Sequence, residues 1–381
     1  MKRYFNGEIP FSELARAYPE LTRDRARYKA EEVRDVLLKT SSFRDDQIVP
    51  YLLFPFDLRC IYYEADAKFL NERRPELWES LVDNEFLLSV PQGRRPSEAL
   101  PLITTTLYDL HVHDRGSAGF PAEIKVARIS RDSNIGGANR VANINEAVAA
   151  GLRKKWNLGG AESDSKLVRD LFRLVIATVY APDYLDENRD HVTYDWAHVP
   201  IPHEYESFQR LASEGDRVAA LLNPAANVEQ NLNDVLGSMR AGLASLHSDK
   251  SEHVSPEDLR LTYSYFGAAQ GSWRSHSELP LSWPECWGET TGDLYINDDI
   301  SFTNVPEKVW RFELGGYPVL KKWLGYRRAN QRGGMPLLLD EVSQLRSVVH
   351  RLAALLLMQD QLNELYHAAA ENSFSCEDFE I

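Results

Sequence analysis

The stretch from Gly292 to Arg332 constrains the fold most, because strand patterns and a helix pattern follow one another within it. Branched and aromatic residues on both sides of Asn297-Asp298-Asp299 predict a β-hairpin over 294–302. Residues 309–314 alternate apolar with polar, which predicts a half-buried strand before a glycine pair. Apolar residues at helical spacing then predict an amphipathic helix over 319–324. A chain that contains this stretch is therefore expected to combine helices and strands.

Strand and helix patterns also divide the rest of the chain. Dense aromatic and branched side chains predict strands over 48–70, 86–90, 102–113, 120–129 and 259–266. Apolar residues at helical spacing predict helices over 24–39, 145–156, 163–180, 204–222, 228–247 and 337–370, the last as one helix or a pair. We therefore expect an α+β fold, with a strand-rich body, a helical section inserted at about 145–250 and a C-terminal helix or helix pair.

These patterns predict three parts: an N-terminal helical lead-in over 1–47, a body over 48–336, and a C-terminal helical segment with an acidic tail over 337–381. A chain of 381 residues with 43% hydrophobic residues can bury a sizeable core. No apolar run is long enough to predict a membrane span, and the N-terminus lacks the apolar stretch of a secretory signal. Three widely spaced cysteines fit a reducing compartment, so we expect a cytoplasmic protein. They are Cys60, Cys286 and Cys376.

Charge is distributed unevenly along the chain. The formal net charge is −14, which by itself argues against nucleic acid as a partner, since nucleic-acid binders usually present a basic surface. Two segments reverse the sign: residues 125–156 hold seven Lys or Arg and two acidic residues, and residues 314–339 hold five Lys or Arg and no acidic residue. Local charge governs a contact surface more than the total does, so both segments are candidates for an anionic partner.

Two short patterns could carry metal chemistry. His111-x-His113-Asp114 places two histidines on one face of a predicted strand, which suits a metal ion, although the sequence indicates no third ligand. Asp114, Glu123 and Lys125 fit the loose spacing of magnesium-dependent nucleases. Histidines at a strand end are more often structural, and the nuclease spacing often arises by chance. We therefore expect neither a metal nor a cofactor.

The sequence lacks the motifs of several other enzyme classes. The glycines at 136–137 belong neither to a dinucleotide fingerprint nor to a P-loop. The aromatic-ended Asn/Asp-Pro-Pro tetrapeptide of amino-methyltransferases is missing, and residues 54–57 have the wrong order. A Gly-x-Ser-x-Gly elbow is missing too. The chain is therefore expected to be non-catalytic by itself.

Several segments resemble one family, in the same order and across nearly the whole chain. They are Tyr51–Arg59 (YLLFPFDLR), Val179–Tyr184 (VYAPDY) with Pro200–Pro202, Tyr263–Trp273 (YSYFGAAQGSW) and Trp287–Asp298 (WGETTGDLYIND). Together with 292–332 they resemble the C-terminal specificity region of type ISP restriction-modification enzymes and related large adenine-specific DNA methyltransferases. Enzymes of that family also carry a nuclease, a helicase-like motor and a methyltransferase, and this chain is similar only to their final, target-recognition part.

The resemblance implies a protein that reads a sequence in double-stranded DNA and positions it for an adenine methyltransferase domain or subunit, in restriction-modification or phage defence. Base and phosphate contacts need Arg, Lys, Asn or Gln in loops or at helix ends. The candidates are Arg94, Arg95, Lys321, Lys322, Arg327, Arg328, Asn330, Gln331 and Arg332. Arg274 and Arg153-Lys154-Lys155 are weaker candidates. In the stretch 292–332, the apolar first part is expected to build the body and the basic end, 321–332, to face DNA.

Two other functions stay open. An acidic protein-interaction module of a defence complex would dock on a basic partner without contacting DNA. A metal-dependent nuclease would use Asp114, Glu123 and Lys125.

Overall fold

The computed structural model describes residues 1–19, 21–64, 69–70, 74–81, 83–90, 100–114, 116–126, 139–158, 164–250, 253–263, 273–278 and 282–379. Its helices are α1 (Phe11–Ala17), α2 (Ala30–Thr40), α3 (Pro75–Leu81), α4 (Glu146–Lys155), α5 (Asp164–Val179), α6 (Pro182–Tyr194), α7 (Tyr205–Leu222), α8 (Glu229–Leu236), α9 (Glu307–Arg311), α10 (Val319–Gly325), α11 (Leu339–Leu357) and α12 (Gln359–Glu371). Its strands are β1 (Ile48–Phe54), β2 (Asp57–Tyr62), β3 (Phe86–Ser89), β4 (Leu102–Thr104), β5 (Leu107–Tyr108), β6 (Ala118–Pro121), β7 (Glu123–Val126), β8 (Asn139–Ala142), β9 (Ser245–Ser248), β10 (Arg274–Ser275), β11 (Thr290–Tyr295), β12 (Ile300–Pro306), β13 (Glu313–Leu314) and β14 (Tyr317–Pro318). The predicted α+β class is confirmed.

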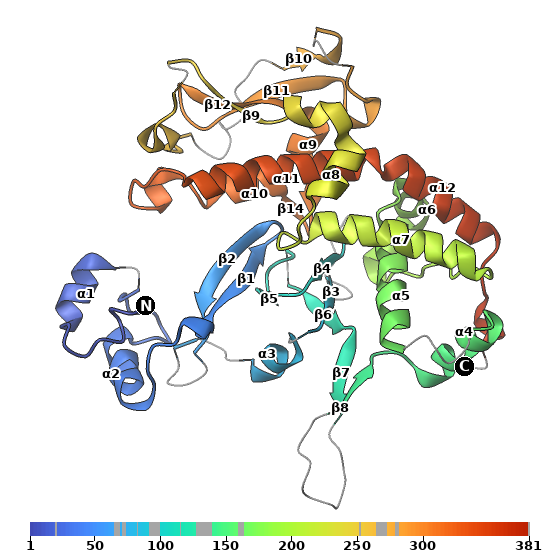
Figure 1. Cartoon of the computed structure of the whole chain (residues 1–381), viewed down its shortest axis with the longest axis horizontal. Helices are drawn as coiled ribbons and strands as arrows, with labels where there is room; N and C mark the ends of the chain where they lie inside the picture. Colours follow the sequence, from blue (N-terminus) through green and yellow to red (C-terminus); the bar gives the residue numbers. More distant parts are fainter. Residues whose placement is uncertain are drawn as a thin grey trace, which may run out of the picture.

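The strands form small sheets (Figure 1). Within the described residues, β1 lies between β2 and β5, β3 lies between β4 and β6, and β7 pairs with β8. A further sheet has the order β10-β11-β12-β9. The predicted hairpin over 294–302 is confirmed as β11 and β12, with Leu294 opposite Phe302. Its turn is held by Asn297, whose side-chain oxygen accepts the backbone N–H groups of Asp299 and Ile300 at 3.0 and 2.9 Å.

Helix α11 is the central element of the core. Figure 1 shows it running between the β9–β12 sheet and the strands β1 to β6. Every residue from 348 to 356 is buried, as expected for a helix surrounded by other elements. The indole N–H of Trp287 donates to the Ala353 carbonyl at 2.9 Å, which attaches the loop before β11 to this helix. The C-terminal helix pair is confirmed, since α12 follows α11 directly.

Helices α5 and α7 form the centre of the helical section and pack closely together. A Cβ on Gly215 would lie 1.9 Å from the Arg173 carbonyl oxygen, so glycine is required at this contact. The Arg173 guanidinium donates to both oxygens of Glu85 at 2.8 Å. Because Glu85 directly precedes β3, this bidentate pair attaches the helical section to the strand-rich body. The helices predicted over 145–156, 163–180 and 204–222 are confirmed as α4, α5 and α7.

The residues before β1 form a small cluster of their own. Its buried members are Tyr4, Leu14, Val33 and Leu37. Inside it, the Arg34 guanidinium donates to three backbone carbonyls of the 4–9 loop at 2.7 to 2.8 Å, so the loop is wrapped around this side chain. Figure 1 shows α1 and α2 beside the body, near the end of β2. The boundaries of the three predicted parts stay predictions.

The strand predicted over 309–314 is wrong for most of its length. Residues 307–311 form α9, and only Glu313 and Leu314 belong to a strand. Val309 and Trp310 are adjacent in the sequence and both are buried. Adjacent residues can share the buried side of a helix, but in a half-buried strand successive side chains point to opposite faces, so one of the two would face water. The alternation of apolar and polar residues arises because the α9 turn and the β13 strand follow one another directly.

The helix predicted over 228–247 is also wrong in its second half. Helix α8 stops at Leu236, because Gly237 takes a positive φ of 53°. Residues 245–248 pair with β12 as β9. The patterns also miss α6, which follows α5 closely and begins with Pro182 in its first turn. Residues 259–263 are not in a strand, and 264–266 lie outside the described residues.

Candidate nucleic-acid interface

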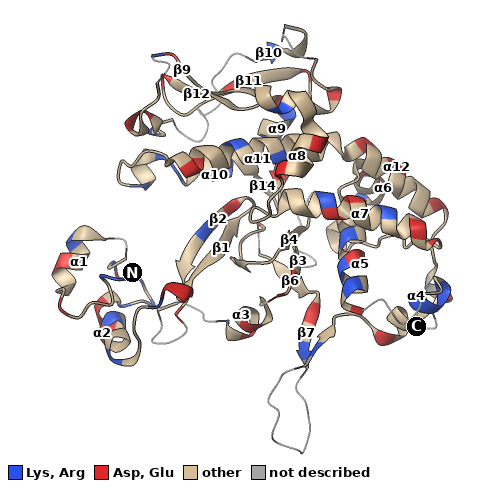
Figure 2. Cartoon of the chain, in the orientation of Figure 1, with Lys and Arg blue, Asp and Glu red and all other residues tan. Residues whose placement is uncertain are grey.

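The basic segment 321–332 begins on α10 and continues into the loop before α11. One side of α10 is buried in the core through Val319, Leu320, Trp323 and Leu324. The helix therefore holds its two lysines at a fixed place on the opposite side. Figure 2 shows that basic and acidic residues both occur around α10 and the start of α11, so the loop meets carboxylates as well as solvent.

Arg327 is the most buried of the predicted DNA-binding residues that the structure describes. Its side chain is 5% exposed and donates to Asp57 Oδ1 at 2.8 Å and to Glu341 Oε1 at 3.1 Å. Its guanidinium also lies 3.7 Å from the ring centroid of Trp323. The structure thus joins β2, α10 and α11 through this one side chain, and Arg327 is occupied within the protein rather than exposed to a ligand.

Both carboxylates of this network are held in the charged form. Burial alone would raise the pKa of Asp57, but hydrogen bonds from Arg59 and Arg327 hold it below its ordinary value. Burial likewise acts to raise the pKa of Glu341, but the Leu338 N–H and the Arg332 guanidinium, with other nearby cations, lower it. Arg332 donates to Glu341 at 2.8 Å, and its side chain is 16% exposed. Arg332 therefore has limited freedom to reach another molecule.

The loop between Arg327 and Arg332 is held rigidly but carries accessible side chains. The Ala329 N–H donates to the Leu261 carbonyl at 2.8 Å and the Leu337 N–H to the Leu259 carbonyl at 2.9 Å. Between these two anchors, the exposed polar side chains are Asn330 and Gln331, and the partly exposed Arg328 lies just before the first anchor. These three candidates lie together on a fixed backbone, which is the arrangement that base or phosphate contacts need.

The two lysines of α10 rest on aromatic rings. Lys322 Nζ lies 4.1 Å from the ring centroid of Tyr317 and 4.5 Å from that of Phe54. Burial lowers the pKa of Lys322, and the charge of Asp114 acts in the opposite direction. Lys321 Nζ lies 5.4 Å from the Trp310 ring centroid. Both ammonium groups therefore gain stabilising contacts inside the chain, and neither is a freely moving surface charge.

The other basic candidates differ in their surroundings. Arg94 and Arg95 lie outside the described residues. Arg274 donates to both oxygens of Asp293 at 2.6 and 2.7 Å, and thereby ties β10 to β11. Lys155 donates to Asp378 at 2.9 Å, and Arg153 pairs with Asp164. The basic segment 125–156 is thus neutralised, in part, by carboxylates of this chain.

The histidine and nuclease patterns take other roles in the structure. His113 is buried, with Ser117 Oγ 2.9 Å from one ring nitrogen and the Leu100 carbonyl 3.2 Å from the other, so both nitrogens are occupied. Burial lowers its pKa to about 4. A Cβ on Gly315 would lie 2.9 Å from the His113 ring, which explains the glycine there. Lys125 donates to Glu79 at 2.9 Å on the surface.

Sequence reasoning missed an exposed apolar group beside the loop. Met335, Leu338 and Leu339 are 56, 60 and 66% exposed, and Tyr326 is 43% exposed. The sequence predicts one helix or a helix pair over 337–370, but α11 begins at Leu339 and its buried residues begin only at Leu345. The sequence does contain a signal for this exposure. Leu338 and Leu339 lie more than one helical turn before Leu345, the first residue of the buried apolar stripe of α11. The loop therefore presents polar and apolar side chains side by side.

Comparison with known families assigns the chain. The model of the Type ISP C-terminal specificity domain matches residues 9–352. The chain belongs to this family. The match covers the strand-rich body, the helical section and most of α11, and it confirms the resemblance drawn from the sequence segments. No curated protein matches the chain. Within the described residues, this specificity domain has no helix that is both long and apolar enough to cross a membrane.

One solved structure shares the fold of this specificity domain and two others are similar to it, all at low sequence identity. A structure described as the DrdV–DNA complex has a TM-score of 0.55 and 14% identity, over 95% of this chain and 32% of that one. The DNA-bound type ISP enzyme LlaBIII has a TM-score of 0.47 and 13% identity, over 90% of this chain and 20% of its own. The LlaGI nuclease-deletion mutant with a DNA substrate mimic has a TM-score of 0.47 and 15% identity, over 90% and 22%. The chain thus spans about a third or less of these proteins.

Proposed function

We propose that this specificity domain reads a double-stranded DNA sequence for an adenine methyltransferase domain or subunit of a restriction-modification or phage-defence system, and that it is non-catalytic by itself. The observation that carries the proposal is the family match over residues 9–352. The structure sharing its fold at a TM-score of 0.55 is a complex with DNA. The acidic net charge does not oppose this function, since the charge that matters is the local one.

The proposed contact surface is the loop 328–332 together with α10. Asn330 and Gln331 are exposed and can make the paired hydrogen bonds that identify an adenine in the major groove. Arg328 suits a guanine edge or a phosphate. Lys321 and Lys322 lie beside them as phosphate contacts that work from held positions, whereas Arg332 supports the loop through its hydrogen bond to Glu341. Arg94 and Arg95 remain candidates from the sequence.

Arg327 takes a different part in this proposal. It is a positioning residue, because its contacts with Asp57 and Glu341 hold the end of α10 against β2 and α11. Substituting it would disturb the loop without removing a DNA contact. Substitution of Arg327 is therefore expected to lower stability, and substitution of its neighbour Arg328 is expected to weaken DNA binding.

Selection from a randomised duplex pool tests the function. The chain is incubated with the pool at fixed salt, alone and with its methyltransferase partner, and bound DNA is sequenced. Enrichment of one sequence is expected in at least one arm. Absence of enrichment in both arms would contradict sequence reading. Arg311→Ala serves as a control variant and should enrich the same sequence as the wild type. Arg311 is an exposed arginine on α9 with a surface ion pair to Glu307, and it lies outside the proposed surface.

The alternative of a protein-interaction module has one specific observation in its favour, the exposed Met335, Leu338 and Leu339. Replacing Leu338 and Leu339 by Ser separates the two. Loss of partner association with unchanged DNA binding would favour docking, and unchanged partner association would favour DNA contact, since Leu338 and Leu339 lie outside the loop 328–332 and α10.

A further inference from the structure

A group of three metal-ligating side chains lies at the C-terminal end of α6, outside the proposed DNA surface. His191, Asp195 and His198 each offer one ligand atom, and these atoms all lie within 4.8 Å of one another. The two imidazole rings have centroids 4.2 Å apart and are inclined by 59°. His198 Nε2 lies 3.8 Å from Asp195 Oδ2. We propose that these residues bind one divalent transition-metal ion of the zinc class.

The backbone that carries the three ligands is held by its surroundings. The Asp195 N–H donates to the His191 carbonyl at 2.9 Å, where Asp195 follows the last residue of α6. The His198 carbonyl accepts a 3.1 Å hydrogen bond from the hydroxyl of Tyr184, a residue that is 1% exposed. Trp196, which lies between Asp195 and His198 in the sequence, packs edge-on against Phe120 with the ring centroids 5.0 Å apart. The protein therefore brings the ligands together before any ion binds.

The donor set identifies the class of ion. Two imidazole nitrogens and one carboxylate oxygen suit Zn²⁺ and its neighbours in the first transition series, whereas Mg²⁺ and Ca²⁺ prefer oxygen donors only. In a tetrahedral site with bonds of about 2.1 Å the ligand atoms lie about 3.4 Å apart. The ligand atoms here lie within 4.8 Å of one another, so they must move closer to reach that spacing. Rotation of the imidazole rings brings them closer, and the His198 side chain is 70% exposed. Three protein ligands leave a fourth position for water or for another molecule.

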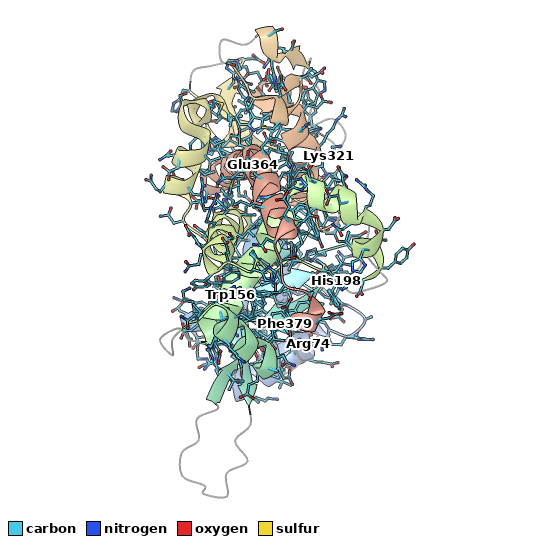
Figure 3. The ribbon with its side chains drawn as sticks, turned by 90° about the vertical axis from the view of Figure 1, so that its right-hand side faces the viewer. Arg74, Trp156, His198, Lys321, Glu364 and Phe379 are labelled. Atoms are coloured by element: carbon cyan, nitrogen blue, oxygen red, sulfur yellow. The ribbon has the colours of Figure 1, made fainter. Side chains whose placement is uncertain are left out.

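The ion would fasten the segment after α6 to the C-terminal end of that helix. That segment continues to Pro202, whose carbonyl accepts the Trp156 indole N–H at 3.2 Å, and Pro202 also forms an isolated β-bridge with Ser373. Figure 3 labels His198 in the lower half of the molecule and Lys321 in the upper half, so the metal group and α10 are separate. The proposal is therefore independent of DNA reading, and loss of the ion should lower stability while leaving DNA sequence preference unchanged.

Metal titration of the full chain tests this. The metal-free protein is titrated with Zn²⁺ by calorimetry and with Co²⁺ by absorption spectroscopy, for the wild type and for His191→Ala, Asp195→Asn and His198→Ala. We expect one ion per chain and visible Co²⁺ bands of a four-coordinate nitrogen and oxygen site. Each variant should weaken affinity at least about tenfold, since even outer-shell partners of metal ligands are worth that much. The variants should fold normally, because the side chains of His198 and Asp195 are 70 and 43% exposed.

His367→Ala is the matched control. His367 is also an exposed histidine beside a carboxylate, with Nε2 2.8 Å from Asp183 Oδ2, but it lacks a third ligand in the described residues. The proposal requires unchanged affinity in this control. Zn²⁺ affinity equal to that of the wild type in a His191→Ala/His198→Ala double variant would overturn the proposal, and so would an equal loss in the control.

Discussion

Arg327 and Arg328 are neighbours in the sequence and experience opposite environments. The Arg327 side chain is 5% exposed and bound to two carboxylates, whereas the partly exposed Arg328 makes a 3.3 Å contact with the Gly325 carbonyl of its own helix end. The difference continues along the loop, since Arg332 joins the buried network and Asn330 and Gln331 remain exposed. A run of basic residues in the sequence therefore does not by itself identify a binding surface. Arg327 and Arg332 hold the loop in place, whereas Arg328, Asn330 and Gln331 are accessible to a ligand.

The largest expected effect is on the buried half. Arg327→Ala leaves Asp57 and Glu341 buried without one of their partners, and removal of one member of a buried pair costs about 3–5 kcal/mol. Arg328→Ala should change the free energy of unfolding by no more than about 0.5 kcal/mol, as surface substitutions usually do. Denaturant unfolding of both variants measures the contrast. Equal costs for the two arginines would remove the distinction between support and surface.

The acid dependence of stability sharpens the same contrast. Because the folded-state pKa values of Asp57 and Glu341 are lowered, these groups stabilise the fold above their ordinary pKa values, and that contribution is lost as pH falls through the folded-state values. We expect the free energy of unfolding to decline from about pH 5 downward. The decline should be shallower in Arg327→Ala, in which part of the interaction is already missing. A slope unchanged by this substitution would contradict the assignment.

The exposed half should govern sequence preference. Asn330→Ala and Gln331→Ala should each cost about 1–3 kcal/mol of discrimination at one base pair if their amides read a base edge. Stability should stay unchanged, because both side chains are exposed. Competition binding with duplexes that differ at one position provides the measurement. A uniform weakening on all duplexes would instead assign these residues to the DNA backbone.

Arg328 separates phosphate contact from base reading. If it contacts a phosphate, Arg328→Ala should weaken binding on all sequences and reduce the slope of log K against log salt by about 0.9. Titration at several salt concentrations gives this slope. Loss of preference at a single base pair, with the slope unchanged, would show base contact instead.

The smallest expected effect concerns Lys322. Lys322→Ala removes a cation held over Tyr317 and Phe54, which should cost about 0.5–2 kcal/mol of stability. Lys322→Arg should keep most of this, since a guanidinium also lies well on aromatic faces. Unfolding measurements on the two variants decide whether the ring contacts matter.

The sequence predicted the elements with long patterns and missed those with short ones. Helices α5, α7 and α11 each repeat an apolar stripe over several turns, so their prediction rests on many residues. In contrast, 309–314 is too short to separate a helical turn from a strand, and the left-handed Gly237 that ends α8 leaves no mark on the apolar pattern before it. Burial of Val309 and Trp310 decided the first case, and the backbone conformation of Gly237 decided the second.

Residue types in the candidate site were predictable, but their partners were not. The sequence identifies 321–332 as basic, yet the separation of Arg327 from Arg328 depends on Asp57, which is distant in the chain and reaches the loop through β2. His191, Asp195 and His198 were missed because α6 itself was missed. Their spacing becomes meaningful only when the helix end turns the three side chains toward one another.

The most direct test of the account combines its two halves in one selection. The Asn330→Ala/Gln331→Ala double variant and the wild type are each offered a randomised duplex pool, with the methyltransferase partner present, and their unfolding free energies are measured in parallel. The account predicts that the double variant keeps wild-type stability and loses the base preference of the wild type at one or two positions. An enriched sequence identical to that of the wild type would contradict the claim that this loop reads DNA.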